Sequence, residues 1–155
     1  TWAVSNGLDG SPGKESGEAN DPDTGGLNNL GEFGLGGDPL NQNDDGSLLH
    51  VTSREVTGGG DPEGVLTIAV RNGAAAKFSA GDPATSTEED GILYTVAANT
   101  TPEVAGGGAG VTVTPFATPA AIATELGTPP AGYEYASFYI NGPEGYFQVT
   151  VDEAP

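Results

Sequence analysis

Closely spaced acidic, amide and glycine residues between Asp21 and Glu32 constrain the fold more than any other part of the sequence. Calcium binds six to eight oxygen atoms, and twelve-residue loops supply them from loop positions 1, 3, 5, 7, 9 and 12. Residues with a suitable oxygen fall at positions 1, 3, 7 (through the main-chain carbonyl), 9 and 12: Asp21, Asp23, Leu27, Asn29 and Glu32. The spacing therefore predicts a Ca²⁺ site in this loop.

Two glycines in the middle of the loop affect this prediction in opposite ways. Gly26 falls at position 6, where the chain turns sharply and a side chain would obstruct the turn. Gly25 falls at position 5 and brings no side-chain oxygen, so Asp38, Asn20 or a water molecule has to supply that ligand. The competing interpretation is an acidic surface turn that binds no ion.

The residues from Asp21 to Pro39, DPDTGGLNNLGEFGLGGDP, resemble the calcium repeat of thrombospondin type 3-like and dockerin-like modules in exported bacterial proteins. The chain departs from that repeat at Gly25, Gly31 and Gly37, where the repeat usually has Asp, a helix-forming residue and Thr. The order of an N-terminal Trp2-Ala3, the repeat and a β-rich tail also looks like the C-terminal module of large secreted surface proteins. This resemblance implies an extracellular, non-enzymatic role for a calcium-binding repeat followed by a β-domain.

Charge and composition narrow the classes of partner. The chain has 155 residues, and 22 acidic residues against four Lys and Arg give a formal net charge of −18. Such a charge repels phosphate backbones and anionic lipids and attracts divalent cations, so no nucleic-acid partner and no membrane insertion are expected. The chain contains no Cys and no apolar run long enough to cross a bilayer, and it begins at Thr1. We expect a mature chain that is secreted or displayed at the cell surface.

The pattern of apolar residues changes near residue 47. Residues 1–46 are polar and Gly-rich, with a helical turn or strand-like hook at Trp2–Leu8 and a short helix expected over Leu27–Leu35. Residues 47–155 alternate apolar and polar side chains between turn signals, which predicts a mainly β domain built as an antiparallel, Ig-like β-sandwich. The expected strands are Leu48–Val56, Leu66–Arg71, Ala75–Ala80, Ile92–Val96, Val111–Phe116, Tyr133–Ile140 and Tyr146–Asp152, with at most one turn of helix at Ala120–Leu126.

Other patterns in the chain have weaker functional interpretations. Asn99-Thr100-Thr101 is an N-glycosylation pattern, although three-residue patterns of this kind often arise by chance. Tyrosines gathered in the tail either stack on sugar rings or cover the core rim and a subunit interface. His50 has no neighbouring Cys or serine motif in the sequence, and we expect no enzymatic activity.

An open sandwich has edge strands that a neighbouring copy can cover. The segment Thr1–Leu8, with Trp2 and Val4, and the last strand, with Tyr146, are the candidates for a head-to-tail contact between copies. The alternative is that Trp2 packs on its own chain. Together these observations predict a calcium-stabilised structural subunit of a self-assembling filament or surface assembly. The second prediction is an adhesion or carbohydrate-binding module that recognises glycans.

Overall fold

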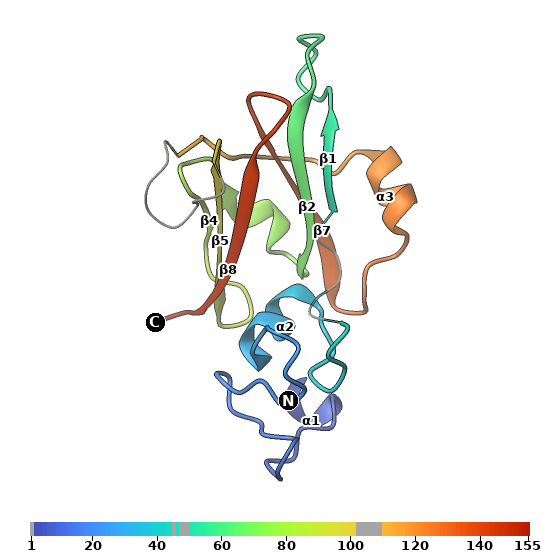
Figure 1. Ribbon diagram of the computed structural model, residues 1–155, viewed down its shortest axis with the longest axis vertical. Helices are drawn as coiled ribbons and strands as arrows, with labels where there is room; N and C mark the ends of the chain where they lie inside the picture. Colours follow the sequence, from blue (N-terminus) through green and yellow to red (C-terminus); the bar gives the residue numbers. More distant parts are fainter. Residues whose placement is uncertain (1, 45, 47–49, 102–109) are drawn as a thin grey trace.

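The computed structural model describes residues 2–44, 46, 50–101 and 110–155. Two four-stranded antiparallel sheets form the body of the molecule, with strand orders β1-β2-β7-β6 and β3-β4-β5-β8 (Figure 1). The strands are β1 (His50–Arg54), β2 (Glu63–Arg71), β3 (Phe78–Ser79), β4 (Ala84–Ser86), β5 (Ile92–Asn99), β6 (Thr114–Phe116), β7 (Tyr133–Ile140) and β8 (Tyr146–Glu153). The helices are α1 (Trp2–Ser5), α2 (Asn29–Leu35), the 3-10 turn η1 (Ala75–Lys77) and α3 (Ala120–Leu126). The predicted mainly β sandwich is confirmed.

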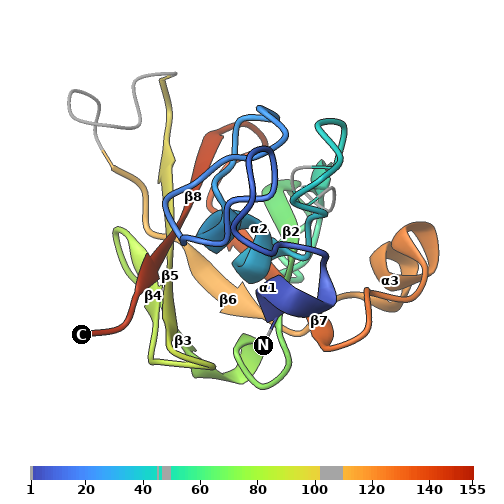
Figure 2. The ribbon, with the colours of Figure 1, turned by 90° about the horizontal axis from the view of Figure 1, so that it is seen from below.

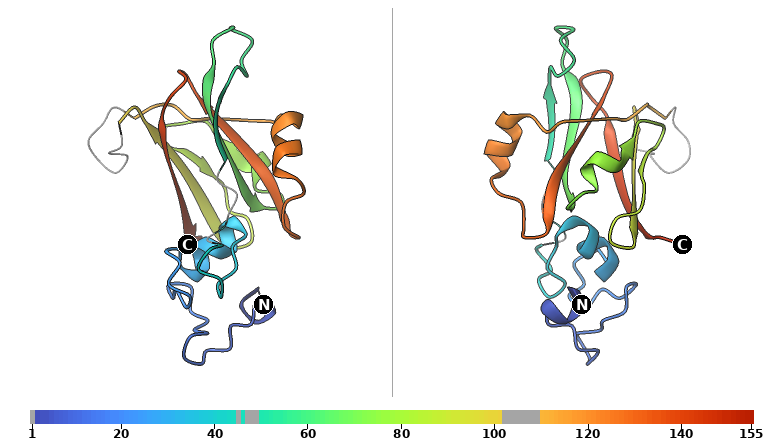
Figure 3. Two further views of the ribbon diagram at one scale, coloured as in Figure 1. Left: turned by 45° about the vertical axis from the view of Figure 1, so that its right-hand side comes forward. Right: turned by 180° about the vertical axis from the view of Figure 1, so that it is seen from behind.

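β2 lies at the centre of the first sheet and is buried on both faces. Its inner face contributes Leu66, Ile68 and Val70 to the core between the sheets, where each is at most 1 % exposed. On its outer face, the Thr67 hydroxyl lies 2.8 Å from the Ser137 hydroxyl of β7 under the segment that leads into α3. Figure 3 shows α3 outside the sandwich, beside the sheet that contains β7. This double coverage explains why the strand is almost continuously apolar.

Most of the predicted elements agree with the structure, but the predicted strand Val111–Phe116 is a strand only from Thr114, as β6, and two further elements differ. β7 and α3 span the predicted residues, β2 and β5 are longer than predicted, and β1 is described from His50, because residues 47–49 lie outside the described chain. The predicted strand Ala75–Ala80 is wrong in its first half, which is η1. The amides of Gly73 and Ala75 both donate to Oε1 of Glu134 on β7, and this distant carboxylate bends the chain into a turn. The short strand β4 was not predicted.

Helix α2 closes one end of the sandwich. Seen from that end, in Figure 2, α2 lies across the space between the two sheets. Leu35 belongs to the buried core of the sandwich, and Leu27, Leu30 and Phe33 pack against that core. The predicted division between residues 1–46 and 47–155 is therefore a change in composition along the chain, while the core extends across it. None of the described helices is long and apolar enough to cross a membrane.

Candidate metal centre

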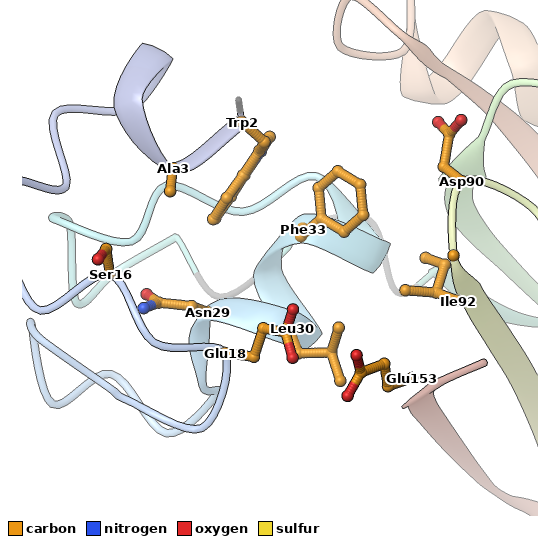
Figure 4. A pocket seen from close by; sticks show the side chains of 11 residues that line it. Trp2, Ala3, Ser16, Glu18, Asn29, Leu30, Phe33, Asp90, Ile92 and Glu153 are labelled. Atoms are coloured by element: carbon orange, nitrogen blue, oxygen red, sulfur yellow. The ribbon is translucent and has the colours of Figure 1, made fainter. Parts of the chain in front are cut away.

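The loop before α2 is organised around Asn29. Its backbone amide donates to the Asn20 carbonyl at 2.8 Å, which folds the predicted calcium loop back on itself. Its side-chain nitrogen donates to the carbonyls of Glu15 at 2.8 Å and Gly17 at 2.7 Å. The side chain is 3 % exposed, and Figure 4 shows its amide directed toward Ser16 and away from Ile92. Both hydrogens of the side-chain nitrogen are therefore used, and the amide oxygen Oδ1 is the remaining polar atom of this side chain.

Four side-chain oxygens from this region are buried without a hydrogen-bond partner in the part of the chain that the structure describes. They are Asp21 Oδ1, Asp23 Oδ2, Asn29 Oδ1 and Asp44 Oδ1. A buried oxygen that accepts no hydrogen bond costs on the order of 1–3 kcal/mol, and more when it carries charge. Four such atoms in one short segment are the expected result when the group that satisfies them is a cation.

Glu32 is a buried carboxylate on the same helix as Asn29. It lies one turn after Asn29, on the same face of α2, and its side chain is 0 % exposed. Carboxylates are almost never fully buried unless they are paired or bind a metal. The helix end fixes its position, because the amides of Gly36 and Gly37 donate to the Glu32 carbonyl at 2.8 and 2.9 Å.

The backbone of Asp44 lies against the C-terminal end of α2. The Asp38 amide donates to the Asp44 carbonyl at 3.0 Å. A Cβ atom built on Gly37 would lie 2.9 Å from that carbonyl oxygen and 3.1 Å from Glu32 Cβ, so the two backbones meet at a position that needs glycine. The sequence analysis missed Asp44. The acidic residues after Asp38-Pro39 were the only sign of this ligand in the sequence. Their position beside α2 depends on the close approach of the Asp44 backbone to Gly37.

The remaining predicted ligands have other environments. Asp38 is exposed, and its Oδ1 accepts a hydrogen bond from the Leu40 amide at 3.1 Å, so its side chain does not join the buried oxygens. The Leu27 side chain packs on the sandwich core, and the predicted role of its main-chain carbonyl as a ligand stays a prediction. Gly26 has φ +128°, in agreement with the predicted sharp turn, and the Gly25 amide donates to Asp23 Oδ1 at 2.9 Å.

The chemistry of this set fits calcium better than a softer ion. The candidate ligands are carboxylate and amide oxygens, which calcium prefers, and the chain has no Cys and one His. In the described part of the chain, no three His, Cys, Asp or Glu side chains form a metal group by themselves.

Two buried tyrosines connect α2 to the sandwich. The Tyr94 hydroxyl on β5 donates to the Gly34 carbonyl at 2.7 Å and accepts from the Arg71 amide at 2.9 Å. The Tyr133 hydroxyl on β7 donates to the Phe33 carbonyl at 2.7 Å. Burial raises the pKa of both hydroxyls, so they remain protonated donors at neutral pH. Carbonyls in the last turn of a helix lack intrahelical partners, and these two obtain them from the sandwich.

Aromatic and cationic side chains extend this connection to the N-terminus. The Arg71 guanidinium lies 4.8 Å from the ring centres of both Phe33 and Tyr133, and Asp90 Oδ2 accepts from its Nε at 2.9 Å. Trp2 packs edge-on against Phe33 with ring centres 5.5 Å apart, as Figure 4 shows. Trp2 thus packs on its own chain, as the alternative interpretation expected, and its place in a contact between copies stays a prediction.

The exposure of their side chains bears on several other predicted sites. Asn99 is 3 % exposed at the end of β5, so the folded chain cannot carry a glycan there, and this prediction is wrong. Val4 is 71 % exposed and Tyr146 is 50 % exposed, as a contact surface requires. The other tail tyrosines form no exposed platform, because Tyr133 is buried, the Tyr135 hydroxyl donates to the Leu126 carbonyl and Tyr139 packs on Phe116.

Comparisons with known proteins give no independent identification. No family model, no curated protein and no solved structure matches this chain.

Proposed function

We propose that this chain is a calcium-stabilised structural subunit of an extracellular filament or surface assembly. The observation that carries the proposal is the set of buried, unpartnered oxygens of Asp21, Asp23, Asn29 and Asp44. With Glu32, they come from the loop, from α2 and from the segment after α2. A hard cation that accepts all of them as ligands would tie three separate segments together.

Asp44 is the proposed substitute for the oxygen that Gly25 lacks. Its buried Oδ1 has no hydrogen-bond partner among the described residues, whereas the exposed Asp38 accepts one from Leu40. A site that depends on a ligand outside its own loop is less preorganised than a complete loop. We expect a dissociation constant on the order of 10⁻⁴–10⁻³ M, the range of extracellular calcium modules.

A structural role follows from where the ion would act. Calcium would order α2, and α2 is hydrogen-bonded to both sheets through Tyr94 and Tyr133. Ion binding would therefore rigidify one end of the sandwich. The net charge of −18 and the resemblance to exported calcium repeats support a location outside the cell and a non-enzymatic role. An adhesion or carbohydrate-binding module has less support, because most tail tyrosines are used in packing.

Isothermal calorimetry with calcium tests the site, with Asp44→Asn and Asp38→Asn as a matched pair. Both variants replace one carboxylate by an amide in the same segment. We expect Asp44→Asn to weaken calcium binding about tenfold or more, the scale of losing one charged ligand, and Asp38→Asn to bind like the original chain. If Asp38→Asn weakens binding and Asp44→Asn does not, Asp38 rather than Asp44 is the ligand. If the original chain does not bind calcium, the proposal is overturned.

Negative-stain electron microscopy with calcium and with excess chelator tests the assembly. Calcium-dependent particles larger than one chain support a structural subunit. Monodisperse single chains in both conditions would contradict self-assembly and favour the adhesion module.

A further inference from the structure

The two long sides of the sandwich have differently protected strand edges. On one side the edge strands are β3, of two residues, and β6, of three residues including Pro115. Backbone hydrogen bonds of 3.1 and 2.8 Å between Gly81 and Val113 join the chain across that side. Very short strands and proline are common protections against pairing with another chain.

The opposite side lacks these protections. Its edge strands are β1, of five residues, and β8, of eight, and neither has a second partner strand within the described residues. Figure 2 shows β8 on the side of the sandwich opposite β3 and β6. An unpaired edge exposes a row of backbone N–H and C=O groups that another strand can bind. This side of the molecule therefore has two free edges, one from each sheet.

An apolar groove lies between these two edges. Its volume is about 420 Å³, and it is lined by Leu27, Leu35, Val51, Leu66, Gly145, Tyr146, Phe147 and Val149. A hollow of about 460 Å³ continues it past Thr52, Ser53 and Glu144. Val51, 58 % exposed, and Tyr146, 50 % exposed, are two of only four exposed large hydrophobic residues in the described chain.

Charge is depleted at this surface. Glu144 is the one charged residue lining either hollow, in a chain with 22 acidic residues. Depletion of charge together with an exposed aromatic residue is typical of the centre of a protein–protein interface. An extended apolar patch of this kind on one side of a molecule indicates a partner surface.

We propose that a second copy of this chain covers the groove, with β1 of each copy pairing with β8 of the other. β1 and β8 run in opposite directions (Figure 1), so a two-fold axis parallel to the strands brings β1 beside the partner's β8 in antiparallel pairing at both edges. The sheet that ends in β1 then continues into the partner's sheet that ends in β8, and the same joint forms at the second pair of edges. The proposal rests on the proposed self-assembling function and defines its first contact as a closed pair.

The charges of the two strands select this pairing over pairing of like edges. β1 carries His50 and Arg54 and no acid, whereas β8 carries Asp152 and Glu153 and no base. Pairing β8 with β8 would bring four carboxylates to one interface, and opposite charges are favoured across paired strands. Because each copy has a net charge of −18, association should strengthen as salt or calcium screens the repulsion.

Sedimentation velocity of the calcium-saturated chain, up to about 1 mM, tests the pair with Val51→Lys and Val4→Lys as matched variants. Both replace an exposed valine, one in the groove and one on α1. We expect the original chain and Val4→Lys to reach twice the monomer mass, and Val51→Lys to dissociate at about tenfold or more higher concentration.

Two results would overturn the pair: a monomer at all concentrations and salt levels, or a dimer lost in Val4→Lys and kept in Val51→Lys. Calcium calorimetry on the same samples separates this inference from the function. A chain that binds calcium and stays monomeric contradicts the pairing and self-assembly and leaves the metal centre standing. A dimer that binds no calcium contradicts the metal centre and leaves the pairing standing.

Discussion

In the sandwich the fully buried side chains are almost all apolar, whereas in residues 2–44 they include Glu32 at 0 % and Asn29 at 3 % exposure. Only Leu8 and Leu35 are buried apolar residues in that first part of the chain, and Leu35 belongs to the sandwich core. Apolar burial can hold the sandwich together without any ligand. The N-terminal region instead buries oxygens of Asp21, Asp23, Asn29 and Asp44 that accept no hydrogen bond among the described residues, and such burial is unfavourable. One molecule thus contains a region that folds by packing and a region that we propose depends on calcium.

The largest expected effect comes from Glu32→Gln, which removes the buried charge and nearly keeps the shape. Calcium at a hundred times its dissociation constant should stabilise the original chain by about 2.7 kcal/mol, and most of this stabilisation should be lost in the variant. Thermal unfolding with and without calcium measures it. Glu18→Gln, at an exposed position before the loop, is the control. Equal calcium stabilisation in Glu32→Gln and the original chain would contradict a role for this residue in the site.

Gly34→Ala is expected to break the contact between the two regions. A Cβ atom at Gly34 would lie 2.6 Å from Val151 Cγ1 on β8, which forces α2 away from the sheet and should cost about 1–3 kcal/mol. Gly31→Ala is the matched control in the same helix, because its Cβ would lie 3.3 Å from Leu27 Cδ2 and alanine favours helix. Urea unfolding compares the two variants, and equal stabilities would show that the packing of α2 on β8 is loose.

Tyr94→Phe should have a somewhat smaller effect, of about 1–2 kcal/mol, because it leaves the Gly34 carbonyl and the Arg71 amide without their shared partner. Burial also raises the pKa of Tyr94 in the folded chain, so unfolded tyrosine ionises first, near pH 10. Stability should therefore fall as pH rises above about 10. This fall should be shallower in Tyr94→Phe, and alkaline unfolding curves of equal slope would contradict the bridge.

The smallest expected effect lies within the sandwich, at the turn between β1 and β2. Hydrogen bonds from the Thr57 hydroxyl and the Val56 amide lower the pKa of Glu63. A lowered pKa gives stability that is present above the unfolded value, near 4.5, and is lost as pH falls through the folded value. Glu63→Gln should remove this acid sensitivity from the hairpin. Amide exchange of β1 at pH 3 and pH 6 measures it, and the variant should give similar protection at both.

Local chemistry made part of the fold predictable. β7 lies between clear turn signals, and α3 lies between Pro119 and Gly127, so both were predicted from the sequence. η1 was mistaken for strand because the carboxylate that bends it, Glu134, is some sixty positions away in the sequence. No local pattern contains that contact.

The candidate site divides in the same way. Loop spacing predicted Asp21, Asp23, Asn29 and Glu32, which the structure buries or half-buries around one helix end. Asp44 was missed because it joins them only when the chain folds back at Gly37. The contact between Trp2 and Phe33 was not predictable, because Phe33 lies on a helix whose docking the sequence does not reveal. The residue types of the candidate site were predictable from the sequence, whereas the contacts between distant segments were not.

Hydrogen exchange with and without saturating calcium tests the central claim most directly, because it reads both regions in one sample. We expect calcium to slow exchange about tenfold or more in the amides of Asn29, Glu32 and Asp38, whose acceptors lie in the metal loop and its return segment. The paired amides of β2 and β7 should exchange at the same rate in both conditions. Unchanged exchange around α2 in saturating calcium would contradict the account.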